Sequence, residues 1–126
     1  MIYVFFDSLS GDEKESFCKK LDDLKVNYNL EDCNLDGEPL GIYSHVFIDI
    51  GGISLPGMGM LYESIVSYIK TQIEENPNTW FIFISTFEEE MEIEFTDQLS
   101  NKGEYKNMLF KNSFMSKEEI QEILNK

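Results

Sequence analysis

The sequence predicts a three-layer α/β protein, in which a five-stranded parallel sheet of strand order 2-1-3-4-5 carries helices on both faces. Three continuous apolar runs, at residues 2–6, 46–50 and 80–84, are typical of strands that are covered on both sides. Segments with helical periodicity separate these runs, and the alternation favours parallel strands joined by right-handed crossovers. The length of 126 residues suits one compact domain, predicted to span residues 1–126.

The first half of the chain alternates between helix and strand patterns. Residues 12–24 repeat apolar side chains at helical spacing, with Phe17 and Leu21 on the expected buried face. Residues 26–30 alternate apolar and polar side chains, which indicates a half-buried or edge strand. Residues 31–41 are rich in Asp, Asn, Gly and Pro, so a loop is predicted there.

The second half continues the alternation. Leu or Ile recurs every four residues from position 61 to position 73, which predicts a long helix that ends before Pro77. Ser116 followed by Glu119 is a capping box, so another helix is predicted to start there. The remaining predictions are a helix over residues 88–99, a strand over residues 108–110, and burial of Ile120, Ile123 and Leu124. The simplest sheet that accommodates this order of elements is flavodoxin-like.

The charge of the chain limits its partners. Acidic residues outnumber basic ones by 24 to 10, and the net charge is −14. Nucleic acid is therefore disfavoured as a partner, because its phosphates would be repelled. The charge is consistent with simple solubility, with docking on a basic protein surface, with mimicry of nucleic acid, or with electrostatic tuning of a bound redox group.

The cellular compartment is predicted from the lack of membrane-spanning, secretory and cysteine motifs in the sequence. No apolar run approaches the roughly 20 residues that span a bilayer. No basic region precedes the apolar run at the N-terminus, so a signal peptide is not expected. Cys18 and Cys33 lack a C-x-x-C spacing, which argues against a zinc site or a dithiol redox motif. We expect a cytoplasmic protein without a membrane segment, in which Cys18 is a buried apolar residue.

The predicted sheet places a binding site at the carboxyl ends of its strands, where the winding reverses between strands 1 and 3. In the first loop at this edge, Ser8 and Ser10 supply hydroxyls and Gly11 allows a tight turn. Together with the backbone N–H groups of the next helix, they suit a phosphate. The acidic Asp12 competes for the same donors, so a turn that only caps the helix is the alternative.

Two further loops are predicted to meet at this edge. Gly51 and Gly52 permit close approach of the backbone to a flat ligand, or simply unusual backbone dihedral angles. Ser85 and Thr86 precede Phe87, which can stack on a ring or belong to the core. The acidic residues 88–94 that follow are interpreted as a solvated helix start.

The chain resembles a known family at several places. The segment from Phe6 to Gly11, together with Phe17 in the helix after it, resembles the opening of the small flavodoxins that serve class Ib ribonucleotide reductase. Gly51-Gly52 resembles their glycine-containing second loop. Residues 108–111 and 116–120 resemble their last strand and the start of their last helix. The likeness extends in outline over nearly the whole chain, and the first motif is its most specific part.

This resemblance implies bound flavin mononucleotide (FMN), which would perform the electron chemistry while the protein positions and tunes it. It also implies a role in supplying an oxidant or electrons to the manganese site of a ribonucleotide reductase subunit. The implied cofactor-binding residues are Ser8, Ser10 and Gly11 with the adjoining Asp12 around the phosphate, and Gly51, Gly52, Ser85, Thr86 and Phe87 around the ring.

Two alternatives to the flavoprotein are open. Asp12 stands where the family has a neutral residue, and no glycine follows Ser85. These departures favour a cofactor-free acidic protein that binds or inhibits a basic partner. Residues 59–63 are similar to a segment of nucleoside deoxyribosyltransferase-like enzymes, in which the glutamate, here Glu63, attacks the sugar. Glu63 is equally suited to favour a helix N-terminus.

Two isolated polar residues complete the candidates. Asp49 interrupts the otherwise apolar run at residues 46–50, and a carboxylate there is costly unless it is paired, so we expect it near the end of the strand. The single His45 is predicted to precede that strand as a structural histidine without a cysteine or serine partner. No hydrolase triad or metal cluster is apparent, and an electron-transfer flavoprotein is favoured over a hydrolase or transferase.

Overall fold

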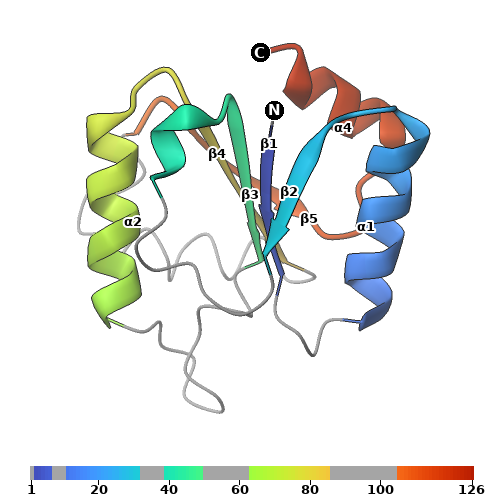
Figure 1. Cartoon of the computed structure of the whole chain (residues 1–126), viewed down its shortest axis with the longest axis horizontal. Helices are drawn as coiled ribbons and strands as arrows, with labels where there is room; N and C mark the ends of the chain where they lie inside the picture. Colours follow the sequence, from blue (N-terminus) through green and yellow to red (C-terminus); the bar gives the residue numbers. More distant parts are fainter. Residues whose placement is uncertain (1, 7–10, 32–38, 50–62, 86–104) are drawn as a thin grey trace.

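A computed structural model describes residues 2–6, 11–31, 39–49, 63–85 and 105–126. Its five strands form one parallel sheet in the order β2-β1-β3-β4-β5, which confirms the predicted flavodoxin-like α/β fold (Figure 1). The elements are β1 (Ile2–Phe5), α1 (Gly11–Asp23), β2 (Tyr28–Glu31), the 3-10 helix η1 (Leu40–Ile42), β3 (His45–Asp49), α2 (Glu63–Glu75), β4 (Trp80–Ser85), β5 (Met108–Asn112) and α4 (Lys117–Leu124).

The helices cover both faces of the sheet. Ile69 and Ile73 of α2 pack on one face, against a cluster that includes Phe81 of β4. Phe17 of α1 and Ile120 of α4 pack on the opposite face. Figure 1 shows this division, with α2 on one side of the strands and α1 with α4 on the other. Because both faces are buried, the central strands are continuously apolar, as the sequence predicts.

Several element boundaries differ from those predicted. β2 extends to Glu31, because its backbone pairs with Phe5 of β1. The predicted loop before β3 contains η1, whose Leu40 is fully buried and whose backbone N–H donates to Gln72 Oε1 of α2 at 3.1 Å. A Cβ at Gly41 of η1 would overlap the side chain of Asn76, so any other residue at this position would require that side chain to move. The predicted helix over residues 88–99 lies outside the described residues.

The capping box of α4 is confirmed. The N–H of Glu119 donates to Ser116 Oγ at 3.2 Å, and the N–H of Ser116 donates to Glu119 Oε1 at 3.3 Å. Ile120 and Ile123 are buried as predicted, whereas Leu124 in the last position is only half-buried.

Asn107 ties the end of α2 to the start of the two strands that follow. Its side-chain N–H groups point at three backbone carbonyls, those of Ile73, Asn76 and Thr79, at 3.3, 3.1 and 2.9 Å. The backbone carbonyl of Asn107 accepts from the backbone N–H of Phe81 at 2.8 Å. Since Asn107 is only 8% exposed, these contacts replace water for groups that would otherwise be buried without a partner.

Candidate functional site

The carboxyl ends of the parallel strands and the N-termini of two helices meet at one edge of the sheet. β3 ends there at Asp49, β4 at Ser85 and β5 at Asn112. α1 starts at this edge six residues after the last residue of β1, and α2 also starts there. Helix N-termini carry unpaired N–H groups and a partial positive charge, so this carboxyl edge is suited to an anionic ligand.

The structure brings three of the predicted cofactor-binding residues to this edge. Gly11 is the first residue of α1, Asp12 follows it with an exposed side chain, and Ser85 is the last residue of β4, paired with Asn112. The other predicted residues, namely Ser8, Ser10, Gly51, Gly52, Thr86 and Phe87, lie outside the described residues.

Asp49 is the last residue of β3, as expected for a carboxylate that ends an apolar strand. Its side chain is 4% exposed, and it makes an interaction within the protein, as burial of a charged group requires. Strand alternation puts Asp49 on the same face as Phe47, which is the face covered by α1 and α4. The carboxyl group of Asp49 is thus buried on the face of the sheet that α1 and α4 cover.

Lys111 supplies a positive charge at the same edge, and the sequence analysis missed it. The sheet register aligns Asp49 with Ile84 and Ile84 with Lys111. The three residues therefore share one face, and two strand spacings separate the Cα atoms of Asp49 and Lys111 by about 10 Å. Lys111 is half-buried. The only signal in the sequence was a lysine that follows a predicted apolar strand. That signal does not reveal on which face of the sheet the lysine side chain lies.

Glu63 occupies the first position of α2. The first turn of a helix is the position at which the helix dipole generally favours a glutamate, so the position of Glu63 in the chain is compatible with the structural explanation. Its position at the carboxyl edge is also the one that the nucleoside-processing hypothesis needs.

Cys18 differs from its prediction as a buried residue, because it is half-buried on α1. Burial raises the pKa of its thiol, which reduces its reactivity at neutral pH. The neighbouring Tyr28 donates to Asp22 Oδ1 at 3.1 Å, and desolvation is the largest cause that raises the pKa of Tyr28 to about 12. Cys33 lies outside the described residues.

His45 is the first residue of β3 and does not precede it. Its side chain is 4% exposed, and its Nε2 lies 3.0 Å from the carbonyl oxygen of Ile123 in α4, which fits the predicted structural role. The expectation that no serine partners it is wrong, since Nδ1 lies 2.9 Å from Ser44 Oγ. The sequence signal was available, because Ser44 directly precedes His45.

The burial of His45 predicts that acid destabilises the protein. Burial lowers the pKa of His45 below its ordinary value of about 6.5, so the unfolded state binds the proton more readily than the folded state. Stability is therefore lost as the pH falls below about 6.5 and on through the lower pKa of the folded state. Urea unfolding at pH 7 and pH 5 should show a smaller loss in His45→Gln than in the original protein. Equal losses in the two proteins would contradict this role of His45.

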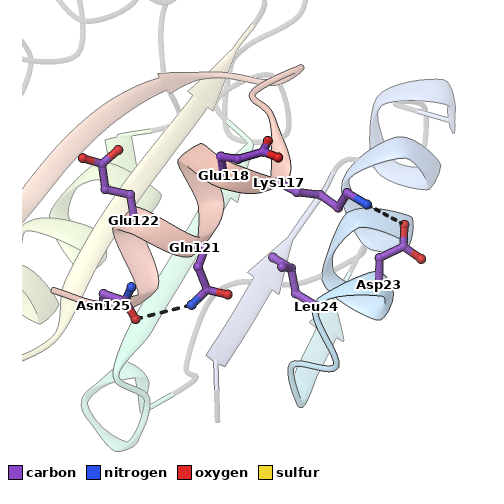
Figure 2. Close-up of a pocket in the computed structure, with 7 residues that line it drawn as sticks. All are labelled: Asp23, Leu24, Lys117, Glu118, Gln121, Glu122 and Asn125. Atoms are coloured by element: carbon purple, nitrogen blue, oxygen red, sulfur yellow. Dashed lines mark hydrogen bonds and ion pairs between the residues drawn. The ribbon is translucent and has the colours of Figure 1, made fainter.

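A groove runs between the C-terminal end of α1 and α4, and we call it the α1–α4 groove (Figure 2). Its volume is about 530 Å³, and its lining residues are Asp23, Leu24, Lys117, Glu118, Gln121, Glu122 and Asn125. Lys117 Nζ lies 3.5 Å from Asp23 Oδ2 across the groove, and both side chains are 47% exposed. Three carboxylates thus line a groove whose one lysine is paired with one of them.

Within the described residues, no group of three or more His, Cys, Asp or Glu side chains is arranged to hold a metal ion. None of the helices seen in the described ranges is long and apolar enough to cross a membrane. Comparison of the chain with protein-family models, with curated proteins and with solved structures finds no match.

Proposed function

We propose that this chain is a cytoplasmic FMN-binding redox protein that assists assembly of the manganese cofactor of a ribonucleotide reductase. One observation supports the proposal most: α1 begins at Gly11, six residues after the last residue of β1, next to the strand pair where the sheet reverses its winding. Ligands of doubly wound sheets bind at that point, and helix N-termini bind phosphate. The segment from Phe6 to Gly11, which resembles the opening of small flavodoxins, leads into this helix.

The charges around the proposed site favour particular flavin chemistry. Lys111 provides a cation on the face that carries the start of α1. Asp12 and Glu13 in the first turn of α1, with the buried Asp49, provide negative charge. These carboxylates disfavour an anionic reduced flavin and thereby lower its reduction potential. The flavin would accept and release the electrons, while the protein binds it and sets this potential.

The proposal is tested by the visible spectrum of the purified protein and by titration with FMN. A yellow protein, or quenching of FMN fluorescence that saturates at one flavin per chain, is the expected result. A colourless protein that leaves the fluorescence of added FMN unchanged would refute it. Lys111→Met should weaken binding, because it removes a cation from the row of the sheet that also holds Ile84 and Asp49.

Asp12→Asn is expected to tighten FMN binding by about two- to five-fold. The substitution removes an exposed carboxylate from the first turn of α1, where one charge is worth about 0.3–1 kcal/mol. Fluorescence titration measures the dissociation constant. Asp23→Asn is the matched control, since Asp23 is the last residue of the same helix. Equal tightening by both substitutions would show an effect of net charge alone and none of the proposed phosphate position.

A second candidate function is a cofactor-free protein that binds a basic partner. The α1–α4 groove favours it, because the carboxylates of Glu118 and Glu122 line the groove and its lysine, Lys117, is paired with Asp23. A lysine-rich peptide, followed by fluorescence anisotropy, should bind with an affinity that falls steeply as salt rises. Glu118→Gln combined with Glu122→Gln should weaken that binding. Binding that responds neither to salt nor to the two substitutions would exclude the groove as its location.

A further inference from the structure

The amino edge of the sheet, opposite the proposed flavin site, holds a serine and a histidine in contact. Ser44 Oγ lies 2.9 Å from His45 Nδ1, and His45 Nε2 lies 3.0 Å from the carbonyl oxygen of Ile123. A carbonyl oxygen can only accept a hydrogen bond, so Nε2 must carry a proton. The backbone of α4 thereby fixes both the orientation of the ring and the position of its proton.

The remaining ring nitrogen is left as a base. Burial lowers the pKa of His45, and the hydrogen bond to Ile123 acts in the opposite direction but is the smaller effect. The ring is therefore neutral at pH 7, and Nδ1 bears a lone pair that accepts the hydroxyl proton of Ser44. A hydroxyl held against a base, with the base oriented by a third group, is the arrangement that activates a nucleophile.

The pair is accessible from a cavity. Ser44 is exposed, and both residues line a cavity of about 340 Å³ at the amino edge. The residues that line the cavity are mixed in character: Ile2, Leu24, Val26 and Leu124 are apolar, and Asn27, Gln121 and Asn125 are amide residues. Among the described residues, those that line the cavity carry no ionised side chain, because His45 is neutral at pH 7, so the cavity suits a small uncharged molecule. Leu24, Gln121 and Asn125 also line the α1–α4 groove, which therefore adjoins it.

We propose that Ser44 and His45 form a nucleophile–base pair that takes the acyl group of a small uncharged carboxylic ester. Ser44 Oγ attacks the ester carbonyl carbon, and its proton passes to His45 Nδ1. The carbonyl oxygen becomes an oxyanion, for which the amide N–H groups lining the cavity are the available donors. The bond to the leaving alcohol then breaks, and that alcohol takes the proton from Nδ1. Water releases the acyl group from Ser44 in a second step, with His45 again as the base.

An activated ester tests the proposal directly. The full chain is incubated with p-nitrophenyl acetate, release of p-nitrophenol is followed by absorbance, and the acetylated residue is located by peptide mass mapping. Acetylation is expected on Ser44 and should be absent in Ser44→Ala. Ser67→Ala, which alters an exposed serine on α2, is the matched control and should retain it.

The role of His45 is tested by His45→Gln, whose amide can still donate toward Ile123 but provides no base. The acetylation rate is expected to fall by about 100-fold or more, as for loss of a general base. In the original protein the rate should rise with pH and level off above the lowered pKa of His45. Acetylation of other residues only, or an equal rate in His45→Gln, would overturn the proposal.

A further variant keeps the test valid if His45→Gln fails to fold. In Ser44→Cys the introduced thiol faces the same imidazole, which should lower its pKa and speed its alkylation by iodoacetamide. Cys18, a half-buried thiol whose pKa is raised by burial, is the internal reference in the same molecule. Alkylation at position 44 that is no faster than at Cys18 would show that His45 does not activate its neighbour.

Discussion

Phe17→Ala is expected to lower the free energy of unfolding by about 3–5 kcal/mol. Phe17 is fully buried on α1, and its ring lies 5.6 Å from that of Phe6 and 5.2 Å from that of Phe47, measured between centroids. The alanine variant loses the transfer free energy of the ring and leaves a cavity between α1 and the sheet. Because the strands around this position are held by backbone pairing on both sides, they cannot collapse to fill it.

Urea unfolding, followed by far-ultraviolet circular dichroism, measures this loss. Phe114→Ala is the matched control, because the same atoms are removed from a side chain that is 53% exposed. Its effect should stay within about 0.5 kcal/mol. Similar losses in the two variants would mean that the packing of α1 on the sheet is not a main source of stability.

Asn107→Asp is expected to cost about 3–5 kcal/mol at neutral pH, as for a buried charge that lacks compensation. The aspartate has the same shape, yet it offers no donor to the carbonyls of Ile73, Asn76 and Thr79 and faces them with negative charge. These carbonyls repel the ionised form, so the pKa of the new carboxyl should be raised in the folded state.

The pH dependence of this variant provides a specific test. When the carboxyl is protonated, it can donate one hydrogen bond again, so the stability difference from the original protein should shrink as the pH falls. Urea unfolding at several pH values measures this difference. Asn78→Asp, at an exposed position in the neighbouring turn, is the control and should show little effect. A cost for Asn107→Asp that does not depend on pH would point to altered packing as its cause.

Much of the fold could be predicted because its signals are local. The apolar runs that became β1, β3 and β4 report burial on both faces, and the Ser116–Glu119 capping box marks the start of α4 within one residue. The boundaries of β2 and the 3-10 turn at Leu40 were predicted less well. Both depend on partners elsewhere in the chain, namely the β1 backbone and Gln72 of α2.

The candidate site was predictable in position more than in chemistry. Because β1 is followed at once by α1 in a parallel sheet, Gly11, Asp12 and Ser85 had to meet at the carboxyl edge once the strand order was known. Lys111 was missed, because the local sequence does not indicate which residues of the neighbouring strands are aligned with a lysine in a strand. Only the register, which aligns Lys111 with Ile84 and Asp49, shows that it lies at the carboxyl edge on the same face as Asp49.

The sequence alone determined the class of the fold, the order of its strands and the acidic character of its surface, because periodicity and composition act over a few residues or over the whole chain. Tertiary structure decided which polar groups meet. His45 reaches Ile123 across 78 residues of sequence, and Asn107 reaches the end of α2 across 31 to 34 residues. Such pairs form because burial removes water from polar groups, which must then form hydrogen bonds with other buried groups of the protein. Their identity therefore follows from how the helices close over the sheet, which no local pattern encodes.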